Sequence, residues 1–207
     1  MLHAASALRS VFALLGAQYI ELSRTLTNED LARPGLTGWT VQELLGHALR
    51  AFSTLESYLD AAPSTDVTMD GAGDYYRTVL ADPTIHADVA ERGRQAGAAL
   101  GTSAAEVASI VETTVSTALA RVDAADDHDD VNTFAGRIGL PAYLATRIVE
   151  AGVHLLDLQR AVGAPVNLDA ATIEMVLVTL AEVGDATAIV LALTGRGALP
   201  TGFNVLA

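Results

Sequence analysis

The segment of residues 140–163 has a helical pattern that is apolar on both sides of a narrow polar stripe, which restricts the folds open to the chain. At about 100° per residue, one apolar stripe comprises Leu144, Ile148, Ala151, Leu155, Leu158 and Val162. The arc beyond the polar stripe is filled by Val149, Val153 and Leu156. A helix with so little polar surface is expected to be buried deeply in its own domain or against a partner.

The polar stripe of this helix carries a carboxylate and an imidazole at metal-ligand spacing. Glu150 and His154 are four residues apart, so their side chains project from one face, one helical turn apart. The stripe is completed by Tyr143, Arg147 and Asp157. Two interpretations stay open, because isolated Glu-x-x-x-His pairs are common by chance. Either the stripe is a solvated face with an exposed Arg147–Glu150 pair, or it lines a polar cavity inside a bundle.

A third candidate ligand, His47, lies far upstream on a second predicted helix. Thr40 followed by Glu43 has the spacing of a capping box, which predicts that this helix begins there. His47 lies beside the apolar stripe of its helix, where a single histidine is more often a hydrogen-bonded residue at the edge of a core. If this helix packs against the one carrying Glu150 and His154, two imidazoles and one carboxylate would leave a metal position open, as in catalytic sites.

Helical patterns separated by Gly, Pro and capping residues account for most of the rest of the chain. They predict helices over residues 2–26, 84–121, 169–183 and 186–194, followed by a coil that wraps back. Ser103 and Glu106 form a second capping-box pattern, which indicates an interruption of the second of these helices.

Two segments have other patterns. Residues 131–140 are expected to be extended, and Pro141 is well placed as the first residue of the helix that follows. The polar, Gly-rich segment from Ser64 to Pro83 is expected to be a long surface loop with about one turn of helix. Loops of that length are usually functional or mobile.

Together these elements predict an all-α protein, with a four-helix bundle and long connections over residues 1–165 and a short helical extension over residues 166–207. The composition agrees with deep burial, since 51% of residues are hydrophobic and only 18% are charged. The apolar segment near the N-terminus is better explained as a helix than as a signal core, and no apolar run reaches the roughly 18 residues that a membrane span needs. We therefore expect a cytoplasmic protein without a membrane partner.

Charge and cysteine content exclude further classes of function. The formal net charge of -13 repels phosphate backbones and anionic lipid surfaces, so nucleic acid is not an expected partner. The chain has no cysteine, which excludes disulfides, thiolate metal sites and a cysteine nucleophile. Any thiol chemistry must therefore use an external thiol.

The two helices that carry the candidate ligands also resemble a known family. The run Gly38-Trp39-Thr40-Val41-Gln42-Glu43-Leu44-Leu45-Gly46-His47 is similar to a signature of the mycothiol-dependent maleylpyruvate isomerase N-terminal family, a branch of the DinB-type metalloenzymes. The spacing of Arg147, Glu150, His154 and Asp157 resembles the R-x-x-E-x-x-x-H-x-x-D helix of that family. Residues 193–196, followed by Gly202-Phe203, are similar to its common tail.

The resemblance implies a DinB-type four-helix bundle that holds one divalent metal, usually zinc, through His47, Glu150 and His154. In such families the metal activates the sulfur of a low-molecular-weight thiol, which is mycothiol in actinobacteria. The lack of cysteine is compatible with that chemistry. The ligand set by itself would also suit nickel, iron or manganese.

Other residues receive candidate roles from their positions. Asp157 and Arg147 are catalytic candidates, with Asp157 orienting a ligand imidazole or pairing with Arg147. The alternative for Asp157 is an exposed pairing with Arg160 or Arg147. Tyr75, Tyr76 and Arg77 are candidates for binding the thiol or the substrate, and the alternative is a surface loop tethered by aromatic anchors.

The chain departs from the family's isomerase, which resembles a two-domain arrangement with a C-terminal α/β domain that helps to bind the substrate. Here only residues 164–207 follow Gly163, and they are predicted to be helices and coil. We therefore expect a metal-dependent thiol S-transferase acting on a small electrophile such as an epoxide, a halide or an activated alkene, rather than an isomerase. The alternatives are a non-catalytic metal- or small-ligand-binding protein and a structural homodimer, and self-association is compatible with each.

Overall fold

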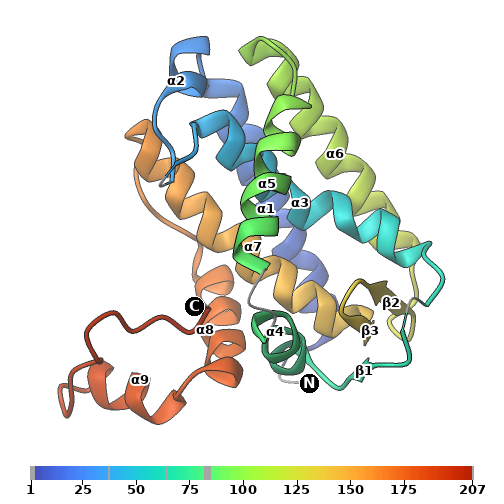
Figure 1. Ribbon diagram of the computed structural model, residues 1–207, viewed down its shortest axis with the longest axis vertical. Coiled ribbons are helices and arrows are strands. Elements are labelled where there is room, and N and C mark those ends of the chain that lie inside the picture. The colour runs from blue at the N-terminus through green and yellow to red at the C-terminus, as the bar shows by residue number, and fades with distance from the viewer. Residues whose placement is uncertain (1–2, 37, 64, 82–84, 207) are drawn as a thin grey trace.

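A computed structural model describes residues 3–36, 38–63, 65–81 and 85–206, and the side chains of all of these except residues 85–90. The helices are α1 (Ala5–Thr25), α2 (Asn28–Ala32), α3 (Val41–Leu59), α4 (Ala72–Leu80), α5 (Ile85–Ala98), α6 (Ala104–Ala124), α7 (Leu140–Val162), α8 (Ala170–Val183) and α9 (Ala186–Leu193) (Figure 1). The strands are β1 (Thr68–Met69), β2 (Asp130–Thr133) and β3 (Gly136–Gly139). The predicted boundaries at residues 1, 2, 64, 83, 84 and 207 lie outside the described residues.

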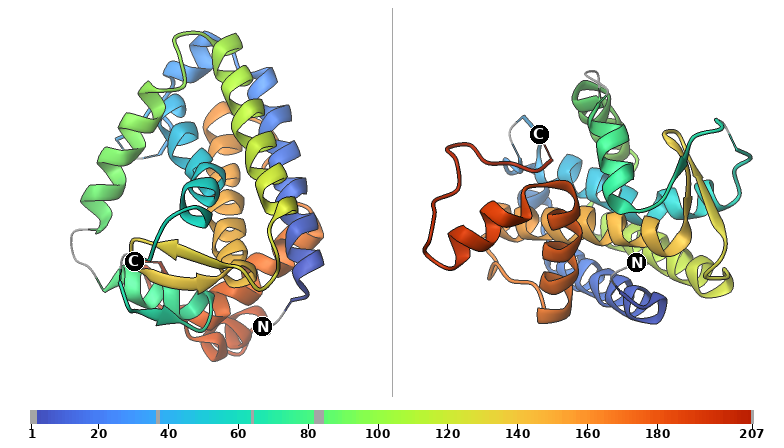
Figure 2. Two further views of the ribbon diagram at one scale, coloured as in Figure 1. Left: turned by 90° about the vertical axis from the view of Figure 1, so that its right-hand side faces the viewer. Right: turned by 90° about the horizontal axis from the view of Figure 1, so that it is seen from below.

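Four long helices form the bundle that the sequence predicts. Helix α1 packs against α6 and α7, and α3 packs against the same two helices, so the four close into a ring around one core. Figure 2 shows α1 and α6 side by side, with α5 at the opposite edge of the molecule. The all-α fold class is therefore confirmed, and the small sheet is an addition to it.

Aromatic side chains fill the centre of the bundle. The rings of Phe12 on α1 and Phe52 on α3 lie 4.8 Å apart, and Tyr19 meets Phe52 edge-on at 5.5 Å. The buried hydroxyl of Tyr19 donates a hydrogen bond of 2.8 Å to the carbonyl of Ala151 on α7. This bond satisfies a buried polar group and ties α1 to α7 one residue from Glu150.

The two helices that carry the candidate ligands begin and end where local chemistry predicts. At the start of α3, the Thr40 side chain accepts from the backbone N–H of Glu43, whose carboxylate accepts from the N–H of Thr40. Pro141 lies in the first turn of α7, and Gly163 ends that helix with a left-handed φ of 75°. These helix ends fix the position of His47 along α3 and of His154 along α7.

Helix α5 crosses α3 at unusually close range because both carry glycine at the crossing. A Cβ added to Gly46 would lie 2.3 Å from the backbone nitrogen of Gly97, and one added to Gly97 would lie 2.6 Å from the Cα of Glu43. The Gln42 amide also donates to the carbonyl of Gly97 at 2.9 Å. The crossing places α5 beside the first half of α3, next to His47.

The segment before α5 differs from the prediction of a surface loop with one turn of helix. Residues 72–80 form α4, which packs against α7. The side chains of Tyr75 and Tyr76 on this helix are buried. Just before it, β1 pairs in parallel with β3. The helix was missed because it is short and its N-cap, Gly71, provides no side-chain hydrogen bond.

The segment predicted to be extended is confirmed as the antiparallel hairpin of β2 and β3, with Val131 opposite Ile138. The predicted helix over residues 84–121 is interrupted as expected. It divides into α5 and α6, and Ser103 caps α6 by accepting a 3.3 Å hydrogen bond from the N–H of Glu106.

The C-terminal extension consists of α8, α9 and a coil that returns toward the bundle (Figure 1). Asp169 caps α8 as predicted, by accepting a 3.0 Å hydrogen bond from the N–H of Thr172. Helix α8 packs against α7 and α4, whereas α9 has no buried residue. A division into two domains at residue 165 stays a prediction. Among the described residues, no helix is both long and apolar enough to cross a membrane.

Candidate metal centre

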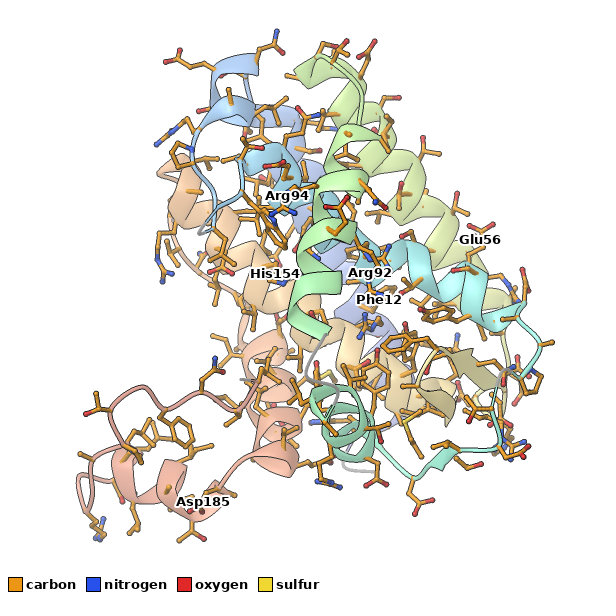
Figure 3. All side chains as sticks on the ribbon, in the orientation of Figure 1. Phe12, Glu56, Arg92, Arg94, His154 and Asp185 are labelled. Atoms are coloured by element: carbon orange, nitrogen blue, oxygen red, sulfur yellow. The ribbon has the colours of Figure 1, made fainter. Side chains whose placement is uncertain are left out.

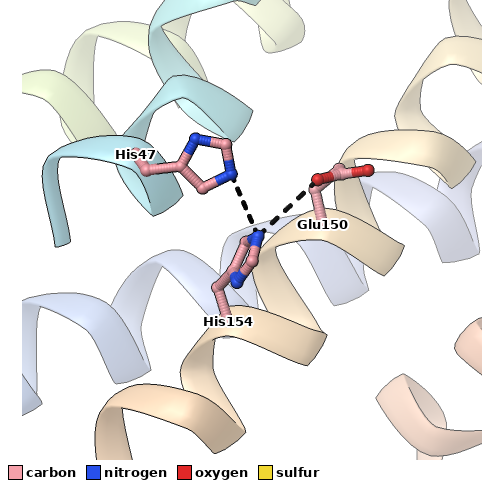
Figure 4. A group of neighbouring side chains, drawn as sticks. All are labelled: His47, Glu150 and His154. Atoms are coloured by element: carbon pink, nitrogen blue, oxygen red, sulfur yellow. Dashed lines mark hydrogen bonds and ion pairs between the residues drawn. The ribbon is translucent and has the colours of Figure 1, made fainter. Parts of the chain in front are cut away.

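The three predicted metal ligands meet where α3 packs against α7. Nε2 of His47 lies 3.1 Å from Nε2 of His154, and Oε2 of Glu150 lies 3.9 Å from the latter nitrogen. One ligand atom from each residue lies within 4.8 Å of the others (Figure 4). Among the described side chains, this is the one group of three or more His, Cys, Asp or Glu residues that converges in this way.

The spacing of these atoms suits a small divalent cation. Zinc binds imidazole nitrogen and carboxylate oxygen at about 2.0–2.2 Å, so two ligands at a tetrahedral angle are about 3.4 Å apart. The observed separations, 3.1 Å for the two nitrogens and up to 4.8 Å across the group, lie around that value. Three protein ligands leave one coordination position for an external ligand, as in catalytic zinc sites.

His47 is held in the protonation state that can bind a metal. Burial, together with the electrostatic effect of nearby His154 and Arg50, lowers the pKa of His47 to about 3. The imidazole is therefore neutral near neutral pH. The ring of Trp39 lies against it at a centroid distance of 4.9 Å, and Trp39 is itself packed against Gly93 of α5. Nδ1 of His47 is buried without a hydrogen-bond partner among the described residues.

The second imidazole has an outer partner. Nδ1 of His154 lies 3.2 Å from Oδ2 of Asp157, which favours a proton on Nδ1 and leaves the lone pair of Nε2 directed toward His47. Of the predicted contacts of Asp157, the one with a ligand imidazole is therefore present. Arg160 lies 3.8 Å from the other carboxylate oxygen and is mostly exposed, so that pairing is weak. Among the described contacts, none joins Asp157 to Arg147.

The carboxylate ligand is held by α4. The hydroxyl of Tyr76 lies 3.3 Å from Oε1 of Glu150 and 3.2 Å from the carbonyl of Thr146. Burial raises the pKa of Tyr76 well above its ordinary value, and the charge of Glu150 raises it further, so the phenol stays protonated and donates. Glu150 is thus oriented by a residue that lies in the segment expected to be a loop.

The metal group lies in the wall of a cavity of about 500 Å³. The whole polar stripe of α7 lines this cavity, namely Tyr143, Arg147, Glu150, His154 and Asp157. Arg147 is only 8% exposed, so the interpretation of the stripe as a solvated face with an exposed Arg147–Glu150 pair is wrong. The stripe is polar because it faces an internal cavity.

A second polar stripe, on α3, was not recognised in the sequence. It lines the same cavity through His47, Arg50, Thr54 and Tyr58, which recur at helical spacing. The hydroxyls of Thr54 and Tyr143 lie 3.0 Å apart and join the two stripes. The wheel that reveals the stripe of α7 would have revealed this one too.

Other cavity residues have no local signal. Arg92 comes from α5, Phe134 from the turn between β2 and β3, and Asn204 and Leu206 from the C-terminal coil. Figure 3 shows Arg92 and His154 in the middle of the molecule and Asp185, at the start of α9, well away from them. Only tertiary packing brings these segments to one cavity.

The three predicted binding residues of α4 separate into two groups. Tyr75 and Tyr76 line the cavity. Arg77 does not, because its guanidinium pairs with Asp74 at 2.6 Å and donates to the carbonyl of Glu182 on α8 at 3.1 Å. A binding role for Tyr75 and Tyr76 stays a prediction that the geometry supports, whereas that of Arg77 has no such support.

Comparison with known protein families matches residues 12–159 to the model of the mycothiol maleylpyruvate isomerase N-terminal domain. The matched span contains His47, Glu150, His154 and Asp157, and it ends before the C-terminal extension. Comparison with curated proteins and with solved structures gave no match.

Proposed function

The chain belongs to the mycothiol maleylpyruvate isomerase N-terminal domain family. From this premise we propose that it is a metal-dependent thiol S-transferase, which joins a low-molecular-weight thiol, mycothiol, through its sulfur to a small electrophile. The observation that carries the proposal is the convergence of His47, Glu150 and His154 in the wall of a cavity of about 500 Å³. Thiol-dependent isomerisation of an electrophile would use the same residues and is the second form of this chemistry.

The reacting sulfur must come from outside, because the chain has no cysteine. A divalent cation, for which zinc is our choice, would when bound lower the pKa of a thiol so that a thiolate exists near neutral pH. The cavity is within the range of about 300–1,000 Å³ that is common for small-molecule sites. It can therefore be tested as a site for a thiol and a small electrophile together.

The residues of the chain would act by positioning and by excluding water. Asp157 holds the ring of His154, and the hydroxyl of Tyr76 holds the carboxylate of Glu150. Apolar side chains, among them Val149 and Val153, line the cavity beside these polar groups. In the transfer step, sulfur forms a bond to carbon while a halide leaves with its electron pair or an epoxide C–O bond opens, and the thiol proton passes to solvent or to the opened oxygen.

Metal content is the first test. Elemental analysis by plasma mass spectrometry would compare the unmodified protein with His47→Ala, His154→Ala and the control His128→Ala, an exposed histidine outside the cavity. We expect about one equivalent of a transition metal, lost in the first two variants and kept in the control. Absence of metal after reconstitution with zinc, nickel and iron would refute the proposed site.

Turnover is the second test. Mycothiol would be incubated with an epoxide, an alkyl halide and an activated alkene, and product formation compared with the uncatalysed reaction. We expect rate enhancement with at least one electrophile, and its loss in His47→Ala. A protein that is saturated with metal yet gives no thiol-dependent turnover would instead be a binding protein.

A further inference from the structure

Arg147 is a buried arginine that forms no ion pair with a carboxylate among the described residues, although its pKa, which burial lowers, is raised overall by the nearby Tyr143 and by the charge of Glu150, one turn along α7. Its side chain lines the metal-site cavity and is 8% exposed. Its Nε donates to the hydroxyl of Thr146 at 3.1 Å, and among the described residues the two terminal nitrogens make no hydrogen bond or ion pair. A buried charge without a paired anion is costly, so its retention in a cavity wall requires a compensating interaction.

Part of that compensation comes from tyrosine rings. The Cζ of Arg147 lies 4.8 Å from the ring centroid of Tyr143 and 5.6 Å from that of Tyr75, both within cation–π range. The two rings also contact each other, with centroids 5.9 Å apart. They restrict the guanidinium without using its terminal N–H groups. Those groups form the planar fork that matches a carboxylate.

Among the described residues, arginines without an ion pair are also more frequent in the cavity than elsewhere. Arg50 and Arg92 line it too, and among the described contacts neither guanidinium has an ion pair. Elsewhere in the described chain, every arginine except Arg196 has a carboxylate within 4.0 Å, as shown by Arg9, Arg24, Arg33, Arg77, Arg94, Arg121, Arg137 and Arg160. The protein has a net charge of -13 and an excess of carboxylates, so arginines without a carboxylate partner are unexpected. The arginines of the cavity differ in this respect from those elsewhere in the described chain.

We propose that Arg147 is a specificity-determining residue that binds a carboxylate on the electrophile, so that the cavity selects acidic electrophiles over their neutral analogues. Arg50 and Arg92 add positive potential to the same cavity. The carboxylate of the electrophile would accept hydrogen bonds from both terminal nitrogens of Arg147. Its electrophilic carbon would then be free to face the three candidate metal ligands. This inference rests on the proposed function for the identity of the ligand, but its binding step can be measured without turnover.

The kinetic test uses iodoacetate and iodoacetamide. Both alkylate a thiolate and lose iodide, but iodoacetate carries a carboxylate where iodoacetamide carries a neutral amide. The chain has no cysteine for either probe to label. The quantity measured is the ratio of kcat/KM for the two probes with mycothiol, corrected for the uncatalysed ratio. We expect Arg147→Met, which keeps the packing volume and removes the charge, to lower this ratio about tenfold or more.

Two further variants sharpen the comparison. Arg147→Lys keeps the charge without the planar fork, so its ratio should fall between those of the unmodified protein and Arg147→Met. Arg94→Met removes a paired, exposed arginine two residues from Arg92 and should leave the ratio unchanged. An equal loss with both probes in Arg147→Met would mean a purely structural role and would overturn the proposal.

The binding test compares the affinity of the protein for benzoate with its affinity for the neutral analogue benzamide. Both affinities are measured by calorimetric titration. We expect benzoate to bind more tightly than benzamide, and Arg147→Met to weaken benzoate binding about tenfold or more. The titration is repeated on His154→Ala, where benzoate binding should persist if Arg147, and not a bound metal, holds the carboxylate. Equal benzoate affinity in the unmodified protein and Arg147→Met would refute the inference. If neither iodo probe is turned over, this titration alone decides the role of Arg147, and the proposed function is judged separately by the turnover test with the epoxide and the activated alkene.

Discussion

The bundle and the C-terminal extension are both rich in apolar residues, but only the bundle buries them. Helix α7 has buried residues around most of its circumference, because α1, α3, α4 and α8 pack against it. Helix α9 is composed of apolar residues and Thr187, yet none is buried, and Val190 and Leu193 are 58% and 77% exposed. Apolar composition therefore predicts a helix with a surface to cover, whereas the neighbouring elements decide whether it is covered.

The same difference explains where the candidate site lies. His47, Glu150 and His154 project from helices that are packed on several sides, so their ligand atoms are held within 4.8 Å of one another. From the described part of the extension, only Asn204 and Leu206 line the cavity. Metal-ligand atoms must be held within less than about an ångström of their binding positions, and here the bundle holds them.

The largest expected effect tests this comparison through stability. Phe52→Ala removes a fully buried ring that contacts Phe12 and Tyr19, so we expect the free energy of unfolding to fall by about 3–5 kcal/mol. Leu193→Ala removes an exposed side chain and should change it by less than about 0.5 kcal/mol. Urea denaturation measures both, and equal losses would show that α9 is covered in solution by a partner, such as a second copy of the chain.

The crossing of α3 and α5 gives the next effect. Gly97→Ala would place a methyl group 2.6 Å from the Cα of Glu43, so we expect a loss of about 1–3 kcal/mol and a displaced α5. Gly139→Ala is the matched control, because nothing lies within 4 Å of its added Cβ and its φ is -63°. Thermal unfolding, with Trp39 fluorescence as a probe of the crossing, would distinguish them. A Gly97→Ala protein as stable as the control would contradict the close approach.

The outer partner of His154 gives a somewhat smaller effect. Asp157→Asn keeps the shape but weakens the hydrogen bond to Nδ1, so we expect metal affinity to fall about 10- to 100-fold, or about 1.4–2.7 kcal/mol. Asp185→Asn in the extension keeps a helix cap and should leave the affinity unchanged. Competition with a chromogenic chelator measures both, and unchanged affinity in Asp157→Asn would make that aspartate irrelevant to the metal.

The smallest effect compares two N-caps. Thr40→Ala removes the cap of α3, which is part of the bundle core, and should cost about 1 kcal/mol of global stability. Asp185→Ala removes the cap of α9, whose residues are all outside the core, and should mainly open that helix locally. Hydrogen exchange would show faster exchange at all slow amides in the first variant and only over residues 186–193 in the second. Identical exchange patterns would mean that the extension unfolds together with the bundle.

Much of the fold and of the candidate centre could be predicted because it depends on local rules. The cap at Thr40, the proline at position 141 and the cap at Asp169 each mark a helix start, and all three are in place. Helical spacing also places Glu150 and His154 on one face. The remaining step, the meeting of α3 and α7, followed from resemblance to the family and from the need to bury two apolar helices.

What failed depended on contacts between distant segments. Helix α4 has no capping side chain, and it packs against α8 and α7, with Tyr75 and Tyr76 buried. Arg77 follows them in sequence but faces away from the cavity, because three consecutive helical residues span about 200° of a turn. No spacing rule could show which side of α4 would face the metal group.

By itself, the sequence determined where the long helices lie, which residues could bind a metal, and that a reacting thiol must come from outside the chain. These depend on hydrogen bonds within a helix, on the helical period and on composition, all of which act over a few residues or none. Only the tertiary structure decided that the polar stripe of α7 faces a cavity, that α5 fits against α3 through Gly46 and Gly97, and that Arg147 is buried with no ion pair among the described residues. Burial and electrostatic environment depend on every neighbour in space, and those neighbours come from segments far apart in the chain.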